Sequence, residues 1–151
     1  MMVKMNARRK SRKDTVKEKK FPISDVAITD VPLTEALVLR RHYDYPGAAP
    51  IFMTNVPHLV IYYSPTGYSF GFHGKGPLDL ALNLCEWYLL QIGYQGQRIK
   101  ERSWLSSEKG DYFQLSFDLH EEFWHDFIEK VPDEGTTISF ADLKEWFDKH
   151  L

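Results

Sequence analysis

The sequence predicts a small α+β domain in which an antiparallel sheet packs with a central apolar helix and two helices near the carboxyl end. Residues 58–73 alternate in polarity as two strands joined by a turn would. Residues 77–92 have a strongly apolar helical pattern, and the last 32 residues hold two amphipathic helical patterns. With 151 residues, 43% of them hydrophobic, the chain can bury one core and has little room for a second.

The first 20 residues differ from the rest in charge. They hold nine Lys or Arg and two acids, a net charge of +7, whereas residues 21–151 hold ten Lys or Arg and nineteen acids, a net charge of −9. The basic arm has no apolar periodicity, so we expect disorder over 1–20 and a single domain over 21–151. The arm can bind nucleic acid or anionic lipid, or fold back on the acidic domain. It can also stay solvated without a specific partner. The arm residues singled out are Arg8, Arg9, Lys10, Arg12 and Lys13.

Composition favours a cytoplasmic protein. No apolar run approaches the roughly 20 residues that span a bilayer. The amino terminus is too basic for a secretory signal and lacks an apolar core segment. The single Cys85 cannot form an internal disulfide, and its place in the apolar helix is typical of a small buried hydrophobe.

Strands are predicted in three places. The stretch "LTEALVLRRHY" can form a helix capped by Thr34 or a strand, and its shortness and the Tyr-Pro-Gly after it favour the strand. "HLVIYY" and "YSFGFH", joined by "SPTG", predict a hairpin over about 58–73. "YFQLSFDL" alternates as a half-buried strand over about 111–118. The second hairpin strand is expected to have one bulky and one bare face: Tyr68, Phe70 and Phe72 against Gly67, Ser69, Gly71 and His73.

Three helices are predicted. The first covers about 77–92, with Pro77 at its first position and Gly93 after its end, and its wide apolar surface indicates the most buried helix. Asp79 is expected to stabilise its first turn. "HEEFWHDFIEKV" and "ISFADLKEWFDKHL" predict two carboxyl-terminal helices, and Ser139 is the expected cap of the second.

Two glycine motifs lack the geometry that their chemistry needs. Residues 67–71 fit the G-x-S-x-G pattern, but Ser69 is predicted to lie within a strand, with His73 about 13 Å away along it. Gly74-Lys75-Gly76 has neither the spacing nor the hydroxyl residue of a phosphate-binding loop. We therefore expect no enzyme, and a hydrolase that uses Ser69 remains as an unfavoured alternative.

The two histidines of "HEEFWH" do not predict a metal site. His120 and His125 are five residues apart, which separates them by about 140° around a helix, whereas a zinc-binding pair is four apart. No cysteine pair is present to supply other ligands. We expect no metal and no cofactor.

The segment "YSPTGYSFGFHGKGPLDLALNL", followed by "FWHDFIEKVP" and "ISFADLKEWF", resembles a group of small uncharacterised proteins of phages, plasmids and other mobile elements. In that group a strand ending in Gly-Tyr-x-Gly-Ser-Gly-Pro leads into an Ala/Leu-rich helix. The likeness covers roughly residues 57–151 and departs at His73 and Lys75. It implies a fold and a genomic neighbourhood but no mechanism. If a phage encodes the protein, the expected location is the host-cell cytoplasm. The residues that carry it are Phe72, Gly74, Gly76, Pro77, Leu80, Ala81, Leu82 and Trp146.

These observations predict a non-enzymatic accessory protein that binds a host or phage protein. An acidic domain can occupy the basic groove of a nucleic-acid-binding defence enzyme and so inhibit it. The alternative is a nucleic-acid-binding accessory protein that uses the basic arm. A membrane partner is not expected. The predicted binding surface is the bare hairpin face with the lysine after it: Gly67, Ser69, Gly71, His73 and Lys75.

Overall fold

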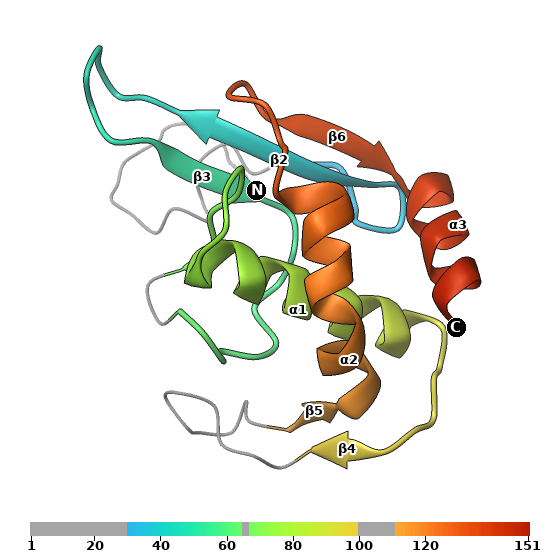
Figure 1. Cartoon of the computed structure of the whole chain (residues 1–151). Helices are drawn as coiled ribbons and strands as arrows, with labels where there is room; N and C mark the ends of the chain where they lie inside the picture. The colour runs from blue at the N-terminus through green and yellow to red at the C-terminus, as the bar shows by residue number, and fades with distance from the viewer. Residues whose placement is uncertain (1–29, 65–66, 100–110) are drawn as a thin grey trace.

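The computed structural model describes residues 30–64, 67–99 and 111–151, and its α+β class is the predicted one. A three-stranded antiparallel sheet has the order β3-β2-β6, formed by β2 (Ala36–His42), β3 (Ile51–Thr54) and β6 (Thr136–Ser139). A separate two-stranded ribbon joins β4 (Arg98–Ile99) and β5 (Tyr112–Phe113). Figure 1 shows the ribbon and the sheet at opposite ends of the domain, with the helices between them. The basic arm lies outside the described residues.

The predicted central helix and both carboxyl-terminal helices are confirmed. The central helix is α1 (Lys75–Gln91), and α2 (Gln114–Phe123) continues into a π-helical turn, η4 (Trp124–Ile128). Figure 1 shows α2 crossing α1, with α3 (Phe140–His150) beside β6. Ser139 caps α3 as predicted, because its hydroxyl accepts a hydrogen bond from the amide of Asp142 at 3.1 Å. Within the described ranges, no helix is long and apolar enough to cross a membrane.

The strand β2 confirms the preference for a strand at "LTEALVLRRHY". It is the central strand of the sheet, where Leu39 lies opposite Thr54 of β3 and Thr136 of β6. Asn55 completes the edge beyond the last β2–β3 pair: its Oδ1 accepts from the Val38 amide at 3.0 Å, and its Nδ2 donates to the Ala36 carbonyl at 2.8 Å. A side chain thus replaces the next residue of the ladder.

The predicted hairpin over 58–73 is wrong. Its described residues, 58–64 and 67–73, contain no strand. Backbone N–H groups of this segment donate hydrogen bonds to side chains of α1, as described below, and not to the carbonyls of a partner strand. Gly67 and Gly71 have φ angles of 116° and 90°, which an extended strand does not permit. Alternating polarity therefore marked a half-buried segment without a β-ladder.

The strand predicted over about 111–118 is mostly wrong. Only Tyr112 and Phe113 pair as a strand, and α2 begins at the next residue. Buried positions recur at three- and four-residue spacing along α2, at Ser116, Leu119 and Phe123. Packing against α1 therefore selected the helical period over the alternating one that the sequence also contains.

The core lies around α1, whose residues from Pro77 to Glu86 are all buried. Apolar side chains from β2, α2, η4 and α3 pack onto it in one cluster. Tyr88 joins α1 to α3, since its ring stacks on Phe147 with the ring centroids 3.9 Å apart and on Phe140 at 5.8 Å. The prediction of a central, most buried helix is confirmed.

Three polar residues interrupt the apolar surface of α1. We call Asp79, Asn83 and Glu86 the buried polar stripe, because they follow each other at four- and three-residue spacing and each is at most 2% exposed. Buried polar groups are costly unless they are hydrogen-bonded. Each of the three binds chain segments outside α1.

Asp79 and Asn83 bind the irregular segment before α1. Asp79 accepts from the amides of Tyr62 and Tyr63 at 3.1 and 3.0 Å with one oxygen and from Ser64 at 3.0 Å with the other. Burial raises the pKa of Asp79, and the three amide bonds oppose that rise. Asp79 therefore anchors residues 62–64. Because α1 begins at Lys75, Asp79 lies beyond its first turn and Pro77 is not its first residue, so both of these predictions are wrong.

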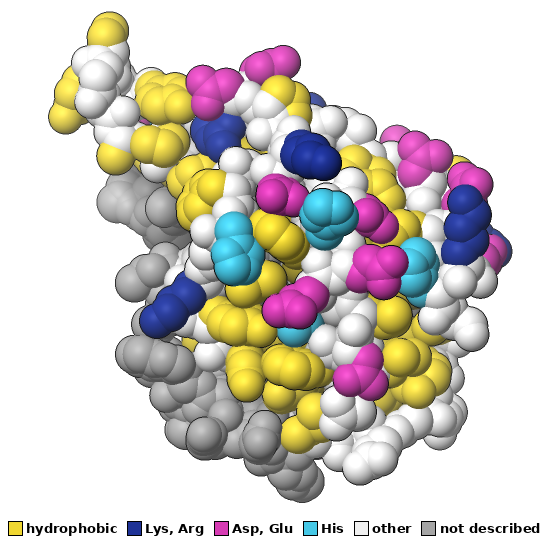
Figure 2. All heavy atoms as spheres, in the orientation of Figure 1, with side chains coloured by type: hydrophobic (Ala, Val, Ile, Leu, Met, Phe, Trp, Pro, Cys, Tyr) yellow, Lys and Arg dark blue, Asp and Glu magenta, His cyan; other side chains and the backbone are white. Residues whose placement is uncertain are grey.

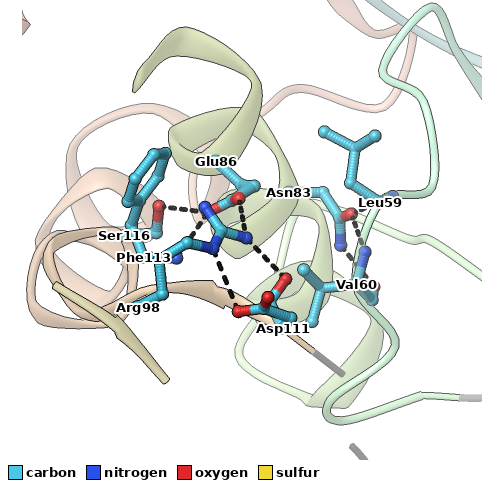
Figure 3. A network of polar contacts seen from close by, with 8 residues as sticks. All are labelled: Leu59, Val60, Asn83, Glu86, Arg98, Asp111, Phe113 and Ser116. Carbon is cyan, nitrogen blue, oxygen red and sulfur yellow. Dashed lines mark hydrogen bonds and ion pairs between the residues drawn. The ribbon is translucent and has the colours of Figure 1, made fainter. Parts of the chain in front are cut away.

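Asn83 uses both ends of its amide in the same way. Its Oδ1 accepts from the amides of Leu59 and Val60 at 2.6 and 2.8 Å. Its Nδ2 donates to the carbonyls of Val60 and Asp79, both at 2.8 Å. Figure 3 shows Asn83 facing this segment, whereas Glu86 turns to the other side of the helix. One side chain thus satisfies four backbone groups.

Glu86 connects α1 to the β4–β5 ribbon and α2. Its Oε1 accepts from the Phe113 amide at 3.0 Å and from the Ser116 hydroxyl at 2.8 Å. Its Oε2 lies 3.2 Å from Arg98, which also contacts Asp111 (Figure 3). The buried carboxylate is therefore both paired and hydrogen-bonded, as a buried charge requires.

We expect Asn83→Ala to lower the free energy of unfolding by about 3 kcal/mol or more, because several buried backbone groups lose their partner at about 1–3 kcal/mol each. Urea unfolding followed by circular dichroism measures the change. Gln91→Ala, at the exposed end of α1, serves as control and should stay within about 0.5 kcal/mol. Equal stability of the two variants would contradict the anchoring role of Asn83.

Candidate functional site

The predicted binding residues do not form the bare face of a strand. Ser69 packs against the start of α1, where a Cβ built on Gly76 would lie 2.2 Å from its hydroxyl oxygen. The Gly71 amide donates to the Ile128 carbonyl at 2.9 Å. His73 is exposed and its ring contacts Trp124, whereas Lys75 is the exposed first residue of α1. Gly67 lies at the start of the same irregular loop.

The predicted bulky face is also wrong. Phe70 is fully buried in the core, whereas Phe72 is 45% exposed. The positive φ of Gly71 turns the backbone between the two phenylalanines, so they do not share a side. Tyr68 is partly buried and its hydroxyl donates to the Pro57 carbonyl at 2.7 Å. Residues 67–74 are therefore a loop that packs against the rest of the domain. The Trp124 indole also holds this loop, because it donates a hydrogen bond of 2.9 Å to the Phe72 carbonyl.

The position of Ser69 does not fit a nucleophile elbow. That turn needs the serine between a strand and a helix that begins immediately. Here the described residues before it, 58–64 and 67–68, contain no strand, and α1 begins six residues after Ser69, at Lys75. The G-x-S-x-G match is therefore explained by the turns and close contacts of the loop.

Arg41 of β2 holds the loop at Gly71. Its guanidinium donates to the Phe70 carbonyl and to the Pro132 carbonyl, both at 2.9 Å, and lies over the Phe70 ring, 4.9 Å from its centroid. A Cβ on Gly71 would lie 2.4 Å from this guanidinium and 3.2 Å from the Val131 carbonyl oxygen. Gly71 is thus a close-packed position and cannot serve as an open contact surface.

We expect Gly71→Ala to destabilise the fold by about 2–4 kcal/mol, from backbone strain plus displacement of Arg41. Gly47→Ala is the matched control, since its φ of 86° is nearly that of Gly71 at 90° and no atom lies within 4 Å of the added Cβ. It should cost only the strain, about 1 kcal/mol. The urea midpoints of the two variants measure the loss of stability. Equal losses would show that the contacts at Gly71 do not contribute to the free energy of unfolding.

His120 belongs to the fold and does not pair with His125. Its Nδ1 faces the Phe117 carbonyl, so this nitrogen carries the proton, and Nε2 accepts from the Tyr63 hydroxyl at 2.8 Å. Burial lowers the pKa of His120 and raises that of Tyr63, so the pair is neutral. His125 is exposed and lies 2.9 Å from Glu129. The predicted divergence of the two histidines is confirmed.

Cys85 also belongs to the core. It is fully buried, and burial raises the pKa of its thiol well above the usual value. A thiol in that state is a poor nucleophile and a poor metal ligand. The prediction of a small buried hydrophobe at this position is confirmed.

The surface of α2 and η4 carries a row of acidic residues that we call the acidic stripe. Its acidic residues recur mostly at three- and four-residue spacing, as positions on one side of a helix do. The carboxylates therefore share the side opposite Leu119 and Phe123. Figure 2 shows acidic and histidine side chains gathered on this side of the domain. From Gln114 to Glu129 the chain has no Lys or Arg. The stripe consists of Asp118, Glu121, Glu122, Asp126 and Glu129.

One cluster at the edge of the acidic stripe has the atoms to hold a metal ion. A carboxylate oxygen of Glu122, one of Asp126 and a ring nitrogen of His150 all lie within 4.8 Å of one another. His150 is the last residue of α3 and reaches Glu122 at 3.2 Å. Sequence reasoning missed the cluster, although the four-residue spacing of Glu122 and Asp126 was readable. The position of His150 depends on how α3 packs.

A scan against models of protein families, a search of curated proteins and a search of solved structures each find no match to the chain. The resemblance to the mobile-element group therefore stays a prediction that rests on the sequence motifs.

Proposed function

We propose that the protein is a non-enzymatic accessory protein of a phage or other mobile element that binds a basic protein through the acidic stripe. The observation that carries this proposal is the charge of residues 111–151, which hold eleven acids and three lysines. The mobile-element setting rests on the resemblance in residues 57–151. Ser69 and Gly71 of the predicted binding loop are packed against other parts of the fold. We therefore place the proposed contact on the acidic stripe and not on that loop.

The stripe favours a partner with a row of positive charges. Residues three and four apart on a helix have Cβ atoms about 5–6 Å apart, so like charges repel at every turn. A basic partner relieves this repulsion and is steered toward the stripe during association. A regular row of carboxylates also resembles the row of phosphates along a nucleic-acid strand. We therefore infer that the partner is a nucleic-acid-binding protein whose groove the stripe occupies.

Pull-down from host lysate should recover a stoichiometric basic protein that added duplex DNA releases. The triple variant Asp118→Asn, Glu121→Gln, Glu129→Gln should bind that protein at least tenfold more weakly, because three charges of the row are lost. Titration at several salt concentrations should show a smaller salt dependence than for the unchanged chain.

A matched control removes three exposed charges elsewhere, through Asp30→Asn, Glu35→Gln and Glu134→Gln. Its net charge equals that of the stripe variant, so a general charge effect would weaken both equally. Affinity close to that of the unchanged chain is expected for the control. The proposal fails if no stoichiometric partner is recovered or if both triple variants bind equally well.

Nucleic-acid binding by the basic arm is the second candidate, and the +7 charge of residues 1–20 favours it. Labelled duplex DNA should bind the full chain with a salt-dependent affinity. Changing Arg8, Arg9, Lys10, Arg12 and Lys13 to Gln should abolish most of that binding and flatten the salt dependence. DNA affinity that is unchanged by these substitutions would exclude the arm as the binding element.

A further inference from the structure

The end of α3 is fixed to the junction of α2 and η4 by one imidazole. The His150 ring stacks on Trp146 with the ring centroids 3.9 Å apart, and its Nδ1 lies 2.7 Å from the Trp146 carbonyl oxygen. Its Nε2 lies 3.2 Å from a Glu122 carboxylate oxygen. Stacking and the two polar contacts leave the ring little freedom to turn.

These partners determine where the proton of His150 lies. A carbonyl oxygen only accepts, so Nδ1 must donate to Trp146. In the neutral ring Nε2 then has a lone pair, and that lone pair faces a carboxylate oxygen. Two electron-rich atoms at this distance repel each other unless a cation lies at Nε2. The cation is either a proton or a metal ion.

A third ligand atom lies beside this pair. Asp126 is in η4, four residues after Glu122, so both carboxylates lie on the same side of the helix. The Trp146 indole donates to an Asp126 oxygen at 2.7 Å. Trp146 is buried, and it therefore orients both His150 and Asp126 through different atoms, as outer-shell residues of metal sites do.

We propose that Glu122, Asp126 and His150 bind one divalent transition-metal ion of the zinc class. One imidazole nitrogen with two carboxylate oxygens suits zinc better than Mg²⁺ or Ca²⁺, which prefer oxygen alone. Zinc bonds of about 2.1 Å in a tetrahedron place ligand atoms about 3.4 Å apart. The 3.2 Å between His150 and Glu122 fits this spacing, and Glu122, with its side chain 59% exposed, can rotate to bring its oxygen nearer Asp126.

Such an ion would join α3 to the continuous helical segment of α2 and η4, which lies earlier in the chain. It would also neutralise two of the five carboxylates of the acidic stripe. Three protein ligands leave a fourth position for water or for a group of a partner. Binding of the ion would not require a protein partner.

Isothermal titration of the full chain with ZnCl₂ tests the site at about pH 8, which is alkaline enough to limit competition between protons and the metal. One ion per chain should bind, and the melting temperature should rise with ZnCl₂ and return after chelation. MgCl₂ and CaCl₂ should give no comparable binding. His150→Gln and Asp126→Asn should each weaken zinc binding at least tenfold.

His125→Gln is the matched control, because His125 likewise lies beside a glutamate but is outside the cluster. Its zinc affinity should equal that of the unchanged chain. Glu122→Gln changes an exposed side chain and gives a further readout if another variant fails to fold. The proposal is overturned if zinc does not bind, if His125→Gln is as damaging as His150→Gln, or if Glu122→Gln has no effect.

Discussion

The buried polar stripe of α1 is the feature on which the remaining structure depends. An irregular segment beside a helix leaves its amides without a ladder, and burying them unpaired would cost more free energy than a small domain has in reserve. Asp79 and Asn83 satisfy the segment on one side, and Glu86 satisfies the start of α2 on the other. The helix thus contributes both the apolar centre of the core and the hydrogen bonds that a second sheet would have provided.

This arrangement determines where the surface chemistry lies. Glu86 and His120 hold α2 against α1 and the preceding segment, which leaves the opposite side of α2 and η4 in solvent. The carboxylates of that side form the acidic stripe. Trp146 of α3 then packs on the junction and brings His150 to it. The proposed protein contact and the proposed metal site therefore share one helical surface, and Glu122 and Asp126 belong to both.

Local sequence signals predicted the helices and the Ser139 cap well, because helical periodicity, Ser139 and the apolar run of residues 77–92 act within a few residues of each other. They placed the start of the central helix at Pro77, whereas α1 begins at Lys75. They also identified β2 and the burial of Cys85. Alternating polarity at 58–73 and 111–118 was a weaker guide, since it predicted neither the secondary structure nor the buried face: Phe72 is exposed, and the buried positions of α2 follow the helical period. Whether a strand forms depends on a partner, and at 58–64 the partner was a helix.

The sequence by itself determined the α+β class, the central helix, the two carboxyl-terminal helices and the difference in charge between residues 1–20 and the rest of the chain. Only the tertiary structure decided that Asp79 and Asn83 anchor a segment some twenty residues earlier, that Gly71 is enclosed by Arg41, and that His150 meets Glu122. The physical reason is distance along the chain. Propensity and periodicity describe neighbours in sequence, whereas these contacts exist only after the helices have packed.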